Sequence, residues 1–427
     1  CAMLRLGQVN AADQCSGRAF WAACVQLMEH SLLKDKQTNF SIFVAKHDSM
    51  NVYLDNAATT PVAPEVVEAM VPVLLQTFGN PSSTHAFGRQ AKALLENSRR
   101  QIAKYLNCAP SELIFTSGGT EADNMALHAA VTQMGVKRII TSAAEHHAVG
   151  HTATALKDHE HIEVVNLTLD SKGNIDLKEL EALLQAPQKT IVSLMHANNE
   201  IATLLPLEKV SKLCRQYGAL FHSDTVQTMG HYAFDLQSLD IDFITCAAHK
   251  FHGPKGIGFL YVNKQTKVVP LIHGGSQERG LRGGTENIAG IVGLAKAMEL
   301  AYTDLEAHQK HVFGLKSHMM ECLKALFPDV AFHGETSYEN ALYTVLNVCL
   351  PATSKAGLLL FTLDLKGVAV SGGSACTSGA TKGSHVLEAI GADMSRPNAR
   401  FSFSRYTTRQ EIDYALEQLE AVYQKNL

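Results

Sequence analysis

The sequence predicts an α/β protein in which helices cover both faces of a mostly parallel sheet, with a smaller α+β domain after it. Short apolar runs alternate with longer amphipathic runs from Met50 onward, as in successive β–α units. The last hundred residues lose this alternation and mix strand-like with helix-like patterns. A chain of 427 residues is long enough for two domains with their own apolar cores.

The apolar runs and the runs between them predict individual elements. We expect strands at 112–116, 138–142, 162–166, 190–196, 220–224, 243–247 and 258–262. We expect helices at 120–133, 149–159, 177–185 and 207–217, and a long helix at about 288–318. The smaller domain should contain strands at 341–349 and 400–403 and a closing helix at 409–425.

Composition excludes several classes of protein. The net charge of -4 gives no electrostatic basis for direct nucleic-acid binding. No apolar run approaches the roughly 20 residues of a membrane-spanning helix, so no membrane is expected. The nine cysteines are scattered and form no Cys-x-x-Cys pair, which argues against a disulfide framework or a zinc knuckle. These features favour a cytoplasmic protein.

Residues 1–49 differ from the rest of the chain. Their apolar run, 19–28, holds only three apolar residues directly before Cys24, too few for a lipoprotein signal. We interpret the segment as a disordered extension or an upstream-translated leader, dispensable for stability and turnover. The alternative is an accessory helix with a weak apolar face formed by Phe20, Val25 and Met28.

Two segments follow predicted strands and carry polar side chains. The sequence SGGTE at 117–121 joins a strand to a helix, where glycines and free N–H groups suit a phosphate, although a simple helix cap is the better interpretation of this segment alone. The sequence SDTVQ at 223–227 places Asp224 at a strand end, where ligands bind in open α/β sheets. A carboxylate that caps a loop would explain Asp224 equally well.

Two further segments carry potential nucleophiles. In AHKFHGPKG at 248–256, Lys250 lies between an apolar strand and a turn, where partial desolvation would make it a nucleophile toward a carbonyl. The alternative is a pair of surface lysines beside a turn. In SGGSACTSG at 371–379, small residues surround Cys376, which favours an exposed, reactive thiol over a structural cysteine.

The order and spacing of these segments resemble the cysteine desulfurases, pyridoxal 5'-phosphate (PLP) enzymes of the class V aminotransferase group. Asp224 precedes Lys250 by 26 residues. The similarity covers 50–423, and its matching stretches are 53–61 (YLDNAATTP), 79–83 (GNPSS), 115–124, 145–146, 195–201, 222–227, 249–258, 277–284 and 371–379. The Ser-Ala-Cys-Thr-Ser core around Cys376 is similar to the branch associated with iron–sulfur cluster assembly.

The resemblance implies PLP fold type I, with a seven-stranded type of sheet in the large domain. It implies a large PLP-binding domain at 66–304 and a small domain formed by 50–65 and 305–427. It also implies a homodimer, because Thr285 matches a residue that contacts the cofactor phosphate of the partner subunit.

The resemblance also assigns roles around the cofactor ring. Lys250 matches the lysine that holds PLP and later moves the Cα proton, and Asp224 matches the partner of the pyridine nitrogen. Gln227 matches a hydrogen-bond donor to the phenolic oxygen, and His146 matches a catalytic histidine stacked on the ring. A capping or zinc-binding role for His146, which clusters in sequence with two more histidines, is the alternative. We expect no carboxylate or cysteine near it to complete a metal site, and no metal for catalysis.

Further matches concern the phosphate and the substrate. Gly119, Thr120 and His249 match phosphate contacts, while Asn199 and Arg400 match groups that hold the substrate carboxylate, Asn199 also beside the cofactor. A guanidinium suits that task because its fork binds both carboxylate oxygens. The chain departs from the family at residue 247, where alanine replaces the usual phosphate-binding serine.

The expected activity is removal of sulfur from L-cysteine, which gives L-alanine and a persulfide on Cys376. An acceptor protein, either an iron–sulfur scaffold, a tRNA-thiolation protein or another carrier, would take the sulfur, and Cys376 would be at most a transient cluster ligand. One alternative is a selenocysteine lyase or another class V PLP enzyme. An alternative of another kind is a non-catalytic scaffold of the same fold.

Overall fold

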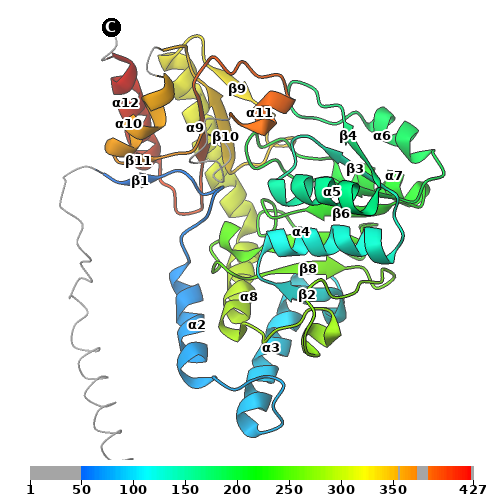
Figure 1. The fold of residues 1–427 in the computed structure, drawn as a ribbon. Helices are drawn as coiled ribbons and strands as arrows, with labels where there is room; N and C mark the ends of the chain where they lie inside the picture. Colours follow the sequence, from blue (N-terminus) through cyan, green and yellow to red (C-terminus); the bar gives the residue numbers. More distant parts are fainter. Residues whose placement is uncertain (1–49, 354–355, 373–382, 425–427) are drawn as a thin grey trace, which may run out of the picture. The chain divides into compact units, whose positions relative to one another are not determined.

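The computed structural model describes residues 50–353, 356–372 and 383–424, and its centre is one seven-stranded sheet (Figure 1). The strand order is β2-β8-β7-β6-β5-β3-β4. Strands β4, β3, β5, β6 and β7 run parallel, while β8 is antiparallel to both β7 and β2. The strands are β2 (Leu113–Thr116), β3 (Arg138–Ser142), β4 (Glu163–Leu167), β5 (Thr190–Ser193), β6 (Leu220–Asp224), β7 (Phe243–Ala247) and β8 (Gly258–Val262). The predicted fold class is confirmed.

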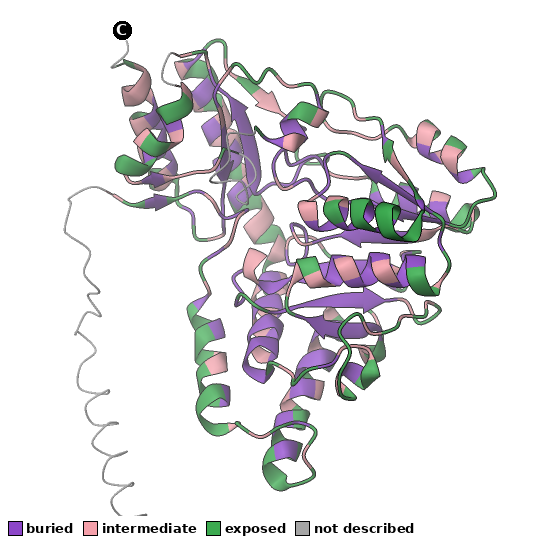
Figure 2. Cartoon of the chain, viewed as in Figure 1, coloured by how far each residue is buried: buried purple, intermediate pink, exposed green. Residues whose placement is uncertain are grey.

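Alternate residues of each strand in this sheet point to opposite faces, and helices cover both faces. Leu113 and Phe115 of β2 join the core formed with α3 and α8, whereas Ile114 joins the core formed with α4 and α5. The strands of this sheet are largely buried, while the outer faces of α2 and α5 are exposed (Figure 2). The helices are α2 (Pro64–Gln76), α3 (Ala86–Tyr105), α4 (Gly119–His128), α5 (His147–Glu160), α6 (Leu177–Leu184), α7 (Leu207–Gln216) and α8 (Ile288–Thr303).

A second apolar core is formed mainly by the carboxyl-terminal part of the chain. It is built on a three-stranded sheet of order β12-β10-β9 and on the parallel pair β1–β11. Its elements are β1 (Val52–Tyr53), α9 (Leu305–Leu326), β9 (Ala331–His333), β10 (Val345–Cys349), α10 (Leu359–Leu365), β11 (Val368–Ala369), β12 (Asn398–Ser402) and α12 (Arg409–Gln424). The short helix α11 (His385–Ala389) packs instead in a separate small cluster with Ala144 and Ile201. The proposed division into 66–304 and 50–65 with 305–427 stays a prediction.

The long helix expected at about 288–318 is wrong as a single element. Asp304 leaves the helical region, with φ -128° and ψ 41°, so that α8 ends at Thr303 and α9 begins at Leu305. The break lets one helical run serve two cores, because α8 packs on α2 and α3 while α9 packs on α12. Aspartate is among the residues that favour a helix start, although the Asp304 side chain makes no capping hydrogen bond here.

Other boundaries shift by a few residues. The helix expected at 120–133 ends as an α-helix at His128 and continues as a π-helical turn at Ala129–Gln133. The strands expected at 190–196 and 341–349 are shorter, because the first ends at Ser193 and the second begins at Val345. Helices α2 and α3 were not among the predicted elements. Among the described residues, no helix is long and apolar enough to cross a membrane.

Candidate active site

A cavity of about 260 Å³ lies where the parallel strands β5, β6 and β7 end. The carboxyl ends of parallel strands meet at one edge of a sheet, so loops distant in sequence converge there. Its walls are Ala57, Ala58, Gly119, Thr120, Asp123, His146, Met195, Asn199, Asp224, Val226, Gln227, Ala247, His249, Lys250 and Arg400. Of the site residues expected from the sequence that the structure describes, all except Thr285 line this cavity.

Asp224 is the last residue of β6 and is buried. Its Oδ1 accepts a hydrogen bond of 2.8 Å from the backbone N–H of Val226, which is the loop-capping contact considered as an alternative. Burial raises the pKa of Asp224 to about 6, and the negative charge of Asp123 raises it further, while His146 opposes the shift. A cation placed in the cavity would favour the ionised carboxylate.

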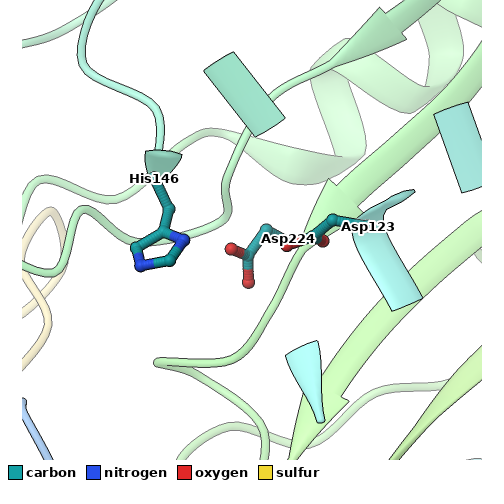
Figure 3. A group of neighbouring side chains, drawn as sticks. All are labelled: Asp123, His146 and Asp224. Atoms are coloured by element: carbon teal, nitrogen blue, oxygen red, sulfur yellow. The ribbon is translucent and has the colours of Figure 1, made fainter. Parts of the chain in front are cut away.

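His146 faces the Asp224 carboxylate, and Asp123 lies behind that carboxylate (Figure 3). One ligand atom from each of these three residues lies within 4.8 Å of the other two. The expectation that no carboxylate lies near His146 is therefore wrong, because the sheet brings α4 and β6 beside the start of α5. His146 also caps α5, since its Nδ1 accepts a 3.2 Å hydrogen bond from the N–H of Ala148. Burial lowers the pKa of His146, and Asp224 opposes this change.

Lys250 lines the cavity and lies in the short turn that follows β7. Its Nζ donates hydrogen bonds to the carbonyl oxygens of Ala57, at 2.5 Å, and Ala58, at 2.9 Å. The amide Nε2 of Gln227 donates to the same Ala57 carbonyl at 3.0 Å. The segment after β1 thus supplies backbone acceptors to both side chains, and these contacts hold Lys250 and Gln227 at the cavity rim.

The start of α4 forms the end of the cavity nearest β7. The N-cap residue is Gly118, which has no side chain to cap the helix. The interpretation of this segment as a simple side-chain cap is therefore wrong. A Cβ on Gly119 would lie 2.7 Å from Cγ2 of Val226, so only glycine lets the helix start this close to the Asp224 loop. Thr120 is exposed toward the cavity, and Ala247 adds only a methyl group to this wall.

Arg400 enters the cavity from β12. Its guanidinium donates 2.8 Å from Nη2 to Oδ1 of Asp55 and 2.9 Å from Nη1 to the backbone carbonyl of Asn199. Only 1% of the Arg400 residue is exposed, and its buried Nε has no hydrogen-bond partner among the described residues. A buried guanidinium with an unused donor can bind an anionic group that enters the cavity.

Among the expected residues that the structure describes, Thr285 is the one that lies outside this cavity. Thr285 is exposed and lines a separate hollow with Ser117 and Arg282. Cys376 lies outside the described residues. His249 does line the cavity, and its Nδ1 lies 3.1 Å from the hydroxyl of Thr59.

Sequence reasoning missed the buried wall residues Asp123 and Met195. Asp123 lies four residues after Gly119 on α4, and a polar residue at an apolar helical position was the available signal. Ala57 and Ala58 contribute backbone atoms, which residue type cannot reveal.

The cavity fits pyridoxal phosphate. A helix start with Gly119 suits the phosphate, because the first N–H groups of a helix lack partners within it. The buried carboxylate of Asp224 suits a protonated pyridine nitrogen, and Lys250 suits an aldehyde. These three features line one cavity and differ in chemistry as the three ends of that cofactor do.

Comparison with known proteins places this architecture in one family. The aminotransferase class-V family model matches residues 52–415. The cysteine desulfurase IscS of Dictyoglomus turgidum is 42% identical over 378 residues, which cover 88% of this chain and 95% of that protein. A cysteine desulfurase of Nostoc sp. is 40% identical over 384 residues, covering 88% and 93%.

Solved structures agree with the sequence relatives. A NifS-like protein has a TM-score of 0.81 and 37% identity, covering 88% of this chain and all of that one. SspA in complex with cysteine has a TM-score of 0.72 and 32% identity, covering 84% and 100%. The chain therefore belongs to the class V aminotransferase family and to its cysteine desulfurases.

Proposed function

We propose that the protein is a PLP-dependent cysteine desulfurase that converts L-cysteine to L-alanine and leaves a persulfide on Cys376. The convergence of Lys250, Asp224, His146 and Arg400 on one cavity carries this proposal. An aminotransferase would need Lys250, Asp224 and His146 but no reactive thiol. A desulfurase needs these three residues and a reactive thiol as well. The names of the sequence relatives support the same activity.

The bound cofactor supplies a sink for the electron pair released at the substrate Cα. Asp224, when ionised, holds a proton at the ring nitrogen. Gln227 and His146 flank the same volume from separate loops and would orient the ring. The Nζ of Lys250 removes the Cα proton and can return it later in turnover. The two Ala carbonyls that accept from Lys250 fix the direction from which that amine acts.

The phosphate end would be held by the start of α4. Backbone N–H groups at Gly119 and Thr120, with the Thr120 hydroxyl, supply donors, and His249 lies at the same end of the cavity. Alanine at position 247 removes one hydroxyl that the family usually provides. Binding of the phosphate thus relies more heavily on the helix start.

Arg400 and Asn199 would bind the substrate carboxylate. The guanidinium already joins Asp55 to the Asn199 carbonyl, so its position is fixed before a substrate arrives. Such preorganisation lowers the entropy lost on binding. The Nε of Arg400, which has no hydrogen-bond partner among the described residues, is a donor that a carboxylate could use.

Sulfur transfer needs a thiolate. The Sγ of Cys376 would form an S–S bond to the substrate sulfur while the substrate C–S bond breaks, and the electron pair of that bond would remain with the carbon that takes a proton to become alanine's methyl group. Burial raises the pKa of all five cysteines that the structure describes: Cys108 (to about 12), Cys214, Cys246, Cys322 and Cys349. Thiols with raised pKa values are mostly protonated and are poor nucleophiles, which supports Cys376 in that role.

A homodimer is proposed from exposed apolar surface. Helix α2, the segment after it and the start of α3 expose large apolar side chains at 42–73% of their full area: Val67, Val71, Leu74, Leu75, Phe78 and Phe87. A patch of this kind typically marks a protein interface. Thr285 would then contact the partner's cofactor phosphate. A monomer in sedimentation that retains full turnover would contradict this proposal.

The sulfur acceptor is proposed to be a protein, either an iron–sulfur scaffold or a tRNA-thiolation protein, and the enzyme is proposed to work in the cytoplasm. The IscS relatives support the first acceptor class.

One experiment tests the activity. The purified chain is reconstituted with PLP, its visible absorption spectrum is recorded, and alanine and sulfide are measured with L-cysteine. A cofactor band together with equal amounts of alanine and transferred sulfur is expected. A cofactor band without alanine would favour another class V enzyme, and the absence of both would favour a scaffold. Higher activity on L-selenocysteine than on L-cysteine, with alanine formed from both, would favour a selenocysteine lyase.

A further inference from the structure

A cluster of four buried polar side chains lies directly behind Asp224 in the core of the large sheet. Its members are Asp123 of α4, His222 of β6, Ser193 of β5 and Thr245 of β7. The His222 ring lies between two hydroxyls, with Nδ1 2.8 Å from Oγ of Ser193 and Nε2 3.1 Å from Oγ1 of Thr245. The same Nε2 lies 3.4 Å from Oδ1 of Asp123.

These residues are almost completely enclosed. Asp123 is 1% exposed, and Ser193, His222 and Thr245 are 0% exposed. Oδ1 of Asp123 has no hydrogen bond to any described residue, since its distance from His222 is long. A buried carboxylate oxygen without a good donor is strongly disfavoured as an anion.

The carboxylates of Asp123 and Asp224 are therefore so close that only one of them is ionised. Oxygens of Asp123 and Asp224 lie within 4.8 Å of each other, and two buried like charges at this separation are not both ionised at neutral pH. Burial raises the pKa of Asp123 to about 7, although the Thr245 hydroxyl opposes this. Burial lowers the pKa of His222 to about 4, so this imidazole is neutral and cannot neutralise Asp123.

The same helix links this pair to the phosphate end of the cavity. Gly119 and Thr120 form the first turn of α4, and Asp123 follows one turn later. Because α4 is one rigid element, the position of Asp123 relative to Asp224 is tied to the position of the phosphate cradle. Of the two carboxylates that line the cavity, Asp123 and Asp224, Asp123 is closer in sequence to Gly119 and Thr120.

We propose that Asp123 is a positioning residue that carries the proton of this carboxylate pair, so that one negative charge, on Asp224, faces the ring nitrogen. This inference rests on the proposed function, because the ring nitrogen belongs to the expected cofactor. Without the proton on Asp123, a second negative charge would raise the cost of ionising Asp224. With the proton on Asp123, Asp224 is the one charged carboxylate that faces the ring nitrogen, and Asp123 and His222 lie behind it as neutral groups.

Other titratable groups face the pair from every neighbouring element. They are His222 of β6, Glu145 and His146 before α5, Cys246 of β7 and Lys250 after it. Burial raises the pKa of Glu145 well above its usual value, and both its oxygens accept from the N–H of Met195 at 3.0 Å. Burial also raises the pKa of Cys246. Burial lowers the pKa of His146, so Lys250, on the cavity side, is the cationic side chain among these groups.

Asp123→Asn tests the proposal in the cofactor-free protein, because the amide has the same shape and cannot ionise. A carboxyl group whose folded pKa is raised stabilises the fold below its unfolded pKa of about 3.9, and this contribution is lost as the pH rises through the folded value. The variant lacks that loss. We expect its Tm, relative to wild type, to rise from about pH 4 to about pH 7 and to level off above the folded pKa of Asp123. Asp158→Asn, at an exposed position of α5, is the matched control and should show a constant difference.

Two further readouts locate the proton and connect it to the cofactor. One protonated-carboxyl component of the infrared spectrum at neutral pH should be lost in Asp123→Asn and kept in Asp224→Asn, while the component from the buried Glu145 stays in both variants. In the PLP-titrated proteins, the acid limb of the Kd–pH profile should stay at the same pH in Asp123→Asn, because a protonated Asp123 places no like charge beside Asp224 where Asp224 titrates, whereas a shift to lower pH by about one unit would show that Asp123 is ionised there.

A pH-independent Tm difference, or an infrared band that disappears in Asp224→Asn instead, would overturn the proposal. If the wild-type chain binds no PLP, the proposed function fails, while the measurements on the cofactor-free protein still decide which carboxylate holds the proton.

Discussion

Ser384→Ala should destabilise the protein strongly for a single hydroxyl. The hydroxyl of Ser384 donates to Oε2 of Glu200 at 2.5 Å, and its oxygen accepts at 3.1 Å from the N–H of Leu387, which caps α11. Glu200 is 0% exposed, and its other oxygen, Oε1, has no partner among the described residues. The variant would therefore remove the only hydrogen bond to the Glu200 side chain that is seen within the described residues, together with a helix cap.

The expected loss follows from these two contacts. A buried polar group left without a partner costs about 1–3 kcal/mol, and loss of a serine cap costs about 1 kcal/mol. Since both depend on one hydroxyl, we expect the free energy of unfolding to fall by about 2–4 kcal/mol. Denaturant unfolding of the cofactor-free protein measures this as a lower midpoint with an unchanged slope.

Two variants make the Ser384 result specific. Ser395→Ala removes an exposed hydroxyl that donates to Asp393, and it should change the free energy of unfolding by less than about 0.5 kcal/mol. Ser384→Thr keeps the hydroxyl and should recover most of the stability. If Ser384→Ala unfolded within about 0.5 kcal/mol of wild type, Glu200 would not depend on this contact, and the reasoning would be refuted.

Three further changes probe the cavity. Lys250→Ala should abolish both the visible cofactor band and alanine formation, and normal turnover in this variant would exclude Lys250 as the PLP lysine. Cys376→Ser should still bind PLP and L-cysteine, seen as a spectral change on mixing, but form no persulfide by mass spectrometry; a wild-type rate of alanine and sulfide release would make Cys376 a bystander. Ala247→Ser adds a hydroxyl at the phosphate end and should lower the PLP Kd by roughly tenfold, the effect of about 1.5 kcal/mol from a hydrogen bond to a charged group, whereas an unchanged Kd would show that the serine is dispensable.

Local pattern was sufficient for most of the large sheet. The strands at 138–142, 220–224, 243–247 and 258–262 match the structure at both ends, because buried strands of a covered sheet are short, nearly continuous apolar runs. The helix expected at 288–318 failed for the complementary reason. Its apolar residues continue through Asp304, so periodicity alone gives no sign that the two halves pack on different cores.

The sequence by itself determined which segments carry chemistry. Lys250, Asp224 and Gln227 follow apolar strands, and the glycines before α4 mark a turn that approaches a ligand, because strand ends and glycine turns are encoded within a few neighbouring residues.

Only the tertiary structure decided what these residues meet. It placed Asp123 behind Asp224, joined Arg400 to the Asn199 carbonyl and paired Ser384 with Glu200, 184 residues away. Such contacts depend on strand order and on the depth of burial at each site. Residue type and spacing encode neither of these, since a carboxylate acquires a raised pKa or an unpaired oxygen only when the whole sheet excludes water from it.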